Sequence, residues 1–123
     1  MDLEVLEGAL AVARLGPSET IPEWSEEGEL SVVARTGEEL SIVCEAAIVP
    51  DEIETSGPWR AFRIAGTLDH SLTGILLALA APLAAAEIPI FAVSTFDTDY
   101  VLVPDECFED ARRTLRDDGH GFV

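Results

Sequence analysis

The chain has 123 residues and a formal net charge of −17, with 24 acidic side chains against seven basic ones, all of them arginine. A field of that sign repels nucleic acid and anionic membranes, so neither is an expected partner. The hydrophobic fraction of 48% supports a packed core and argues against disorder.

The distribution of acidic and apolar residues indicates where the protein works. The acidic charge fits two interpretations, attraction of a basic partner or cationic ligand and a solvated surface adapted to high salt. The second is favoured, because acidic residues occur along most of the chain rather than in one block. The N-terminus lacks the basic start and apolar core of a signal peptide, and the longest apolar run, 75–86, is too short to span a bilayer. We therefore expect a halophilic, cytoplasmic protein.

In the first half of the chain, apolar residues predict two strands, 8–15 and 30–35, separated by an acidic segment with room for one helical turn. The acidic segment 50–58, which contains glycine and proline, is the clearest linker. We therefore expect two units, 1–57 and 58–123.

The segment 36–44 fits two structures. Thr36 followed by Glu39 has the spacing of a helix capping box. The same segment also aligns with 95–102, because in each an apolar strand is followed by threonine, three mostly polar residues and an apolar run. This internal repeat favours a hairpin over a helix and makes the first half a degenerate copy of the second.

The second half predicts the order β-α-β-β-α-β. Helix 71–86 carries apolar residues at helical spacing, and Pro82 should kink it, because proline cannot donate to the carbonyl of Ala78. A second helix is expected over 105–116 and ends at Gly119. The expected strands are 59–65, 88–93, 100–103 and 120–123.

Three strings stand out: ELSIVC at 39–44, LTGIL at 72–76 and STFDTDYVLV at 94–103. They resemble the small stand-alone ACT-domain proteins, which are related to aspartate kinase regulatory domains and to cytosolic arginine sensors. The resemblance covers residues 10–119. It implies an α+β fold, a ferredoxin-like (ACT) β-α-β-β-α-β unit after a degenerate N-terminal ACT-like unit, and amino-acid binding where such units meet.

The resemblance places the ligand against the loop between the first strand and helix, and against the neighbouring hairpin. Unpaired N–H groups at the helix start would bind the ligand's carboxylate, and Gly74 would allow close approach. The ligand's ammonium group would bind a carboxylate, either Asp69 of the loop or Asp97 and Asp99 of the hairpin. Asp97 is favoured as a turn-former, and Asp99 fits ligand contact and hairpin stabilisation equally well. The candidate ligand-binding residues are Asp69, Ser71, Thr73, Gly74, Ser94, Thr95, Asp97 and Asp99.

Other chemistries find little support in the sequence. Asp97 and Asp99 form a D-x-D pattern, but the metal-dependent nucleotide-sugar transferases that use it need a far larger scaffold. His70 neighbours Ser71 without any signature of nucleophilic catalysis, and no histidine and cysteine cluster has metal-ligand spacing. We therefore expect no enzyme, no metal and no cofactor.

The expected function is a non-catalytic regulatory module that binds an amino acid at the interface between ACT units and acts through an unidentified protein. That interface could form within one chain or in a homodimer paired through ACT units. The alternative is a ligand-free interaction or scaffold module with the same fold.

Overall fold

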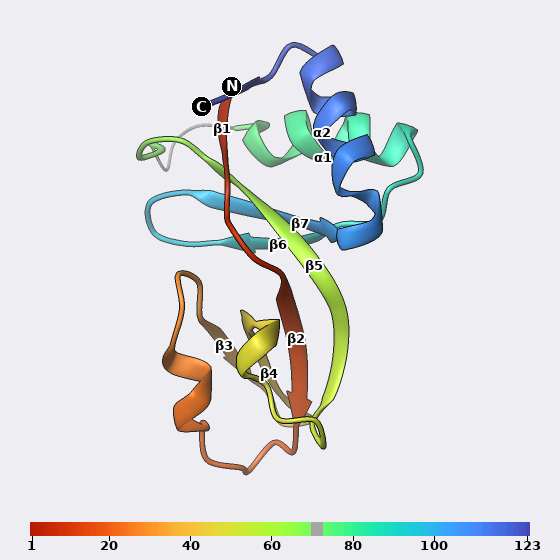
Figure 1. Cartoon of the computed structure of the whole chain (residues 1–123). Helices are drawn as coiled ribbons and strands as arrows, with labels where there is room; N and C mark the ends of the chain where they lie inside the picture. Colours follow the sequence, from red (N-terminus) through yellow and green to blue (C-terminus); the bar gives the residue numbers. More distant parts are fainter. Residues whose placement is uncertain (70–72) are drawn as a thin grey trace. The chain divides into compact units, whose positions relative to one another are not determined.

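The computed structural model describes residues 1–69 and 73–123, which divide into two compact units (Figure 1). The C-terminal unit consists of Met1–Glu7 and Arg60–Val123, and the N-terminal unit of Gly8–Trp59. This division differs from the expected 1–57 and 58–123 chiefly because residues 1–7 pack with the later part of the chain.

The N-terminal unit is built on an antiparallel sheet. Its strands are β2 (Leu10–Leu15), β3 (Val32–Arg35), β4 (Leu40–Glu45) and the first residues of β5 (Glu54–Ile64). Strand β2 lies between β4 and β5, and β3 pairs with β4. Alternate residues of β2 and β4 point inward and form a core of Ala13, Leu15, Leu40, Ile42 and Cys44. Short 3₁₀ turns occur at Glu23–Glu26 and Ala46–Ile48.

The structure confirms the hairpin at 36–44. Strands β3 and β4 pair antiparallel, and the Thr36 N–H donates to the Glu39 carbonyl at 2.9 Å. The later hairpin closes in the same way, with the Thr95 N–H donating to the Thr98 carbonyl at 2.8 Å. The internal repeat seen in the sequence is therefore a repeat of hairpin geometry.

The C-terminal unit contains the expected β-α-β-β-α-β order, and the α+β, ferredoxin-like prediction is confirmed. Its elements after the shared β5 are α1 (Ile75–Ala85), β6 (Phe91–Ser94), β7 (Asp99–Pro104), α2 (Phe108–Asp117) and β8 (Gly121–Phe122), with a 3₁₀ turn at Asp105–Cys107 before α2. Strand β7 pairs with both β5 and β6. None of the described helices is long and apolar enough to cross a membrane.

The N-terminal strand β1 (Asp2–Val5) has no counterpart among the predicted elements. It pairs antiparallel with β5, where Leu3 lies opposite Ile64, and parallel with β8, where Leu3 lies opposite Phe122. It therefore lies between the first and last strands of the β-α-β-β-α-β unit. The side chain of Leu3 is fully buried there.

The two helices pack against each other and against the sheet (Figure 1). The core joins Leu79 and Leu83 of α1 with Leu115 of α2 and with Phe62 of β5. Helix α1 begins at Ile75, so Thr73 and Gly74, which were expected inside it, precede it. The helix continues through Pro82, and the carbonyl of Ala78, which proline cannot bond, lies 3.2 Å from Nε2 of His120.

Candidate functional site

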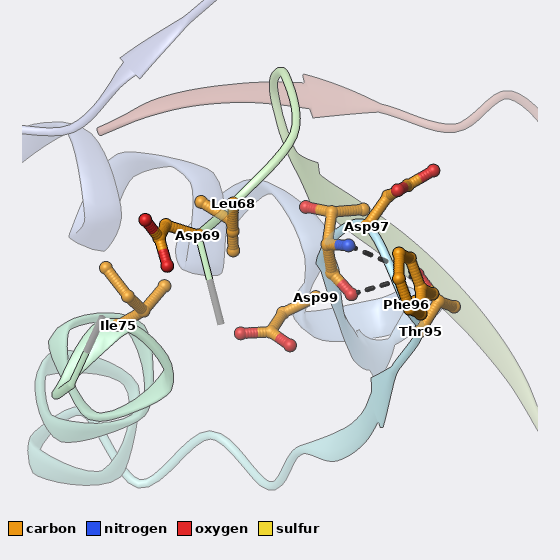
Figure 2. A pocket seen from close by; sticks show the side chains of 8 residues that line it. Leu68, Asp69, Ile75, Thr95, Phe96, Asp97 and Asp99 are labelled. Carbon is orange, nitrogen blue, oxygen red and sulfur yellow. Dashed lines mark hydrogen bonds between the residues drawn. The ribbon is translucent and has the colours of Figure 1, made fainter. Parts of the chain in front are cut away.

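A cavity of about 140 Å³ lies in the C-terminal unit where three segments meet (Figure 2). These segments are the loop after β5, the start of α1 and the turn between β6 and β7. The lining residues are Leu68, Asp69, Ile75, Thr95, Phe96, Asp97, Thr98 and Asp99. The segments are those in which the sequence predicted a ligand.

Hydrogen bonds hold the hairpin turn and the loop together. The Thr95 hydroxyl accepts from the Thr98 N–H at 3.2 Å, which fixes the turn. The buried Thr98 hydroxyl donates to the Ile64 carbonyl at 2.9 Å, and the Leu68 N–H donates to the Asp97 carbonyl at 2.7 Å. Two threonine hydroxyls and one backbone bond therefore fix the position of the turn against the loop, and this part of the cavity wall is held in place.

Four of the predicted site residues line the cavity: Asp69, Thr95, Asp97 and Asp99. Three others, Thr73, Gly74 and Ser94, do not line it, and Ser71 lies outside the described residues. Ser94 ends β6 immediately before the turn, and Gly74 precedes α1.

The carboxylates of the turn have different orientations (Figure 2). The side chain of Asp99 is half-buried and points into the space between Asp69 and the start of the helix at Ile75. The side chain of Asp97 is exposed and points away from Ile75. Asp99 is therefore the carboxylate best placed to meet a bound cation, and Asp97 contributes its backbone carbonyl to the turn.

The start of α1 offers hydrogen-bond donors. The first N–H groups of a helix have no partner within it, and Gly74, the residue that precedes α1, has no side chain to cap them. Gly74 has φ 73°, a left-handed conformation that glycine adopts without strain, and a Cβ built on it would meet no atom within 4 Å. A carboxylate can therefore approach the helix end closely.

Sequence reasoning missed half of the lining. Leu68 and Ile75 supply apolar walls, Phe96 is 81% exposed beside them, and Thr98 is buried. Phe96 lies between Thr95 and Asp97, two predicted site residues, and this position was the signal that could have identified it. The apolar residues carry no such signal, because leucine and isoleucine at these positions also fit an ordinary core.

The charge of the site favours cations. The lining includes three carboxylates and, among the residues that the structure describes, no basic side chain. A metal site finds no support in the described part of the chain, where no group of three or more histidine, cysteine, aspartate or glutamate side chains is placed to hold an ion. The arrangement is suited to binding an ammonium or guanidinium group.

Two family models match the chain. One, described as an ACT domain, matches residues 54–117. The other, described as an N-terminal domain, matches residues 8–52. The two matches lie on the two halves of the chain that the sequence analysis treated as separate ACT-like copies.

The curated relatives are much longer proteins. The cytosolic arginine sensor for mTORC1 subunit 1 of Bos taurus is 41% identical over 66 residues, which are 51% of this chain and 20% of that protein. The Homo sapiens protein of the same name is 45% identical over 49 residues, 39% of this chain and 15% of that protein. The chain thus spans about a fifth or less of the length of these relatives.

Solved structures match nearly the whole chain. A protein from Agrobacterium tumefaciens is 37% identical with a TM-score of 0.92, covering 99% of this chain and 91% of that chain. The regulatory subunit of aspartate kinase from Thermus flavus has a TM-score of 0.65 at 11% identity, covering 96% of this chain and 97% of that chain. The second likeness shows a shared fold.

Proposed function

Because this chain belongs to the ACT-domain family, we propose that it is a regulatory module that binds an amino acid in the cavity between the β5 loop, the β6–β7 turn and the start of α1. It acts without chemistry of its own. The observation that carries the proposal is that the start of α1 and the inward-pointing Asp99 border the same cavity. The first N–H groups of a helix have no partner within the helix itself. These N–H groups and the Asp99 carboxylate complement the two charges of a free amino acid.

Each part of the ligand has a partner in this arrangement. The carboxylate binds the N–H groups that follow Gly74, where the helix dipole adds its positive end. The ammonium group binds Asp99, which is half-buried and therefore less screened than a fully exposed carboxylate. Leu68 and Ile75 contact the aliphatic part of the ligand.

We further propose that the ligand is a cationic amino acid, with arginine as the first candidate. The lining has carboxylates without a described basic side chain, and the curated relatives are named as arginine sensors. A cavity of about 150 Å³ holds a molecule the size of benzene. At about 140 Å³ this one accommodates part of an arginine, and the remainder needs another surface.

A second ACT unit supplies that other surface in this proposal, either within one chain or from a second copy in a homodimer. A ligand that contacts both units binds the paired state more tightly than the unpaired state. Binding therefore shifts the equilibrium between these states towards pairing, by an amount set by the difference in affinity. The paired state then acts on a regulated protein, which is the output of the sensor.

A thermal-shift screen against the twenty amino acids tests the proposal. A ligand at about 100 times its Kd adds roughly 2.7 kcal/mol to stability, which gives an easily measured rise in Tm. Arginine should raise Tm, and Asp99→Asn should abolish the rise while keeping the side chain's shape. Glu109→Gln, which removes one charge from the exposed face of α2, should retain it. A flat screen would contradict the proposal and favour the ligand-free interaction module.

A further inference from the structure

Both units carry the same arrangement of a loop and a hairpin. In the N-terminal unit, β4 pairs with both β2 and β3. In the C-terminal unit, β7 pairs in the same way with both β5 and β6. In each, a glycine follows the first strand, Gly16 or Gly66, and a threonine closes the hairpin, Thr36 or Thr95. The ligand cavity of the C-terminal unit therefore has a counterpart location in the N-terminal unit.

At this location a side chain of the protein itself joins the end of the hairpin strand to the loop. The guanidinium of Arg35, the last residue of β3, donates from Nη1 to the carbonyl of Pro17 and from Nη2 to the carbonyl of Glu19, the latter at 2.8 Å. These carbonyls belong to the loop that follows β2. The planar guanidinium reaches both because its N–H groups form a rigid fork.

The C-terminal unit has no such side chain at the matching position. Aligning Thr36 with Thr95 places Ser94 opposite Arg35. Serine is too short to reach from the end of β6 to the loop after β5. In that unit the loop and turn are instead joined by the backbone bond from Leu68 to Asp97, and the cavity is left open beside them.

We propose that the N-terminal unit contains a guanidinium-binding site that its own Arg35 fills, so that the chain binds a single ligand, in the C-terminal unit. The inference of one ligand per chain rests on the proposed function, whereas the inference of a guanidinium site in the N-terminal unit does not. The surroundings suit a cation, because the same loop borders a hollow of about 350 Å³ whose charged lining residues are four glutamates and one arginine: Glu19, Glu38, Glu52, Glu54 and Arg14. The degenerate unit has thus replaced a diffusible ligand with a tethered one.

Chemical rescue tests the guanidinium site. Arg35→Ala should lower Tm by a few degrees, because two carbonyls lose a charged donor. Methylguanidinium at millimolar concentration should restore part of that loss, and tetramethylammonium at the same ionic strength should not. The wild type sets the baseline, because the chemistry of its C-terminal cavity also suits methylguanidinium, and the rise in Tm of Arg35→Ala should exceed the rise in the wild type. Arg113→Ala is the matched control, because it removes an exposed guanidinium that pairs with Asp110 on α2.

Rescue of both alanine variants alike, or of neither, would overturn the guanidinium site. If Arg35→Ala does not fold, Arg35→Gln keeps a single donor and leaves room for methylguanidinium, so the comparison can be repeated on it.

Isothermal titration calorimetry with arginine tests the stoichiometry. The wild type should bind one arginine per chain, and Arg35→Ala should gain a second, weaker site. Two sites in the wild type would overturn the inference that Arg35 blocks one of them. Absence of binding to the wild type would contradict the proposed function, and the rescue experiment would still decide the guanidinium site.

Discussion

Replacing His120 with alanine tests a contact that arises from one proline in α1. Pro82 has no N–H, so the carbonyl of Ala78 has no partner within the helix. His120 is 8% exposed, and its Nε2 lies 3.2 Å from that carbonyl oxygen. Because a carbonyl can only accept, Nε2 carries the proton. Removing the imidazole leaves this half-buried carbonyl without its donor, which costs about 1 kcal/mol.

A double-mutant cycle isolates this contact from the cavity that alanine also creates. Pro82→Ala restores the N–H that bonds Ala78, so His120→Ala should cost about 1 kcal/mol less in that background than in the wild type. Urea denaturation measures each free energy of unfolding, with an unchanged slope as the check on two-state behaviour. His120→Gln, which keeps a donor, should lose less than His120→Ala. An equal cost of His120→Ala in both backgrounds would refute the reasoning.

Further expectations follow from other contacts. Thr98→Val removes the buried hydroxyl bond to Ile64 and should cost about 1–3 kcal/mol by urea denaturation, whereas no loss would show that the bond is not stabilising. Gly74→Val should lower Tm more than Gly74→Asn, because asparagine tolerates the left-handed backbone; equal losses would contradict this. Burial, and then the charge of Glu45, raises the pKa of the Cys44 thiol. The stability that the protonated Cys44 thiol contributes is therefore fully present below the unfolded pKa of about 8.5 and is lost as pH rises above that value. Tm should decline over this range, and Cys44→Ala should make the decline smaller. Identical pH profiles of the wild type and Cys44→Ala would contradict this prediction. Finally, Tm should fall as salt is diluted from about 1 M to about 0.1 M, where the Debye length grows from about 3 to about 10 Å; a constant Tm would contradict the halophilic adaptation.

The hairpin at 36–44 shows why a local signal needed a second observation. The Thr36 hydroxyl accepts the Glu39 N–H at 3.1 Å, which is the bond that a helix capping box would make. The same bond serves the turn of a hairpin, so the local sequence fits both structures. The alignment with 95–102 selected the correct one, because it compares the apolar runs on both sides of the turn.

Strand β1 was missed although its four residues, DLEV, alternate polar and apolar as in a half-buried strand. So short a run is a weak signal, and the partners of β1, β5 and β8, lie about sixty and more than a hundred positions away. The start of α1 was also misplaced, because apolar spacing predicts which face of a helix is buried and leaves its first residue undetermined.

The candidate site was predictable in its polar part. Asp69, Thr95, Asp97 and Asp99, all predicted from the sequence, line the cavity, because they lie in the loop and the turn that border it. Their orientations were not predictable: the turn geometry directs Asp99 inward and Asp97 outward. The residues that form a turn can be predicted from the sequence, whereas the φ and ψ angles of the turn determine where each side chain points.

The central claim, that an amino acid binds in the C-terminal cavity, is tested most directly by NMR of the ¹⁵N-labelled protein during titration with arginine. The account predicts saturable shifts concentrated on the amides of 68–69, 75–77 and 95–99 in the wild type and absent in Asp99→Asn. The N-terminal unit has a larger hollow, of about 370 Å³, bordered by Ala11, Ala46 and eight residues between Val49 and Pro58. Shifts centred there, or no saturable shifts with any amino acid, would contradict the account.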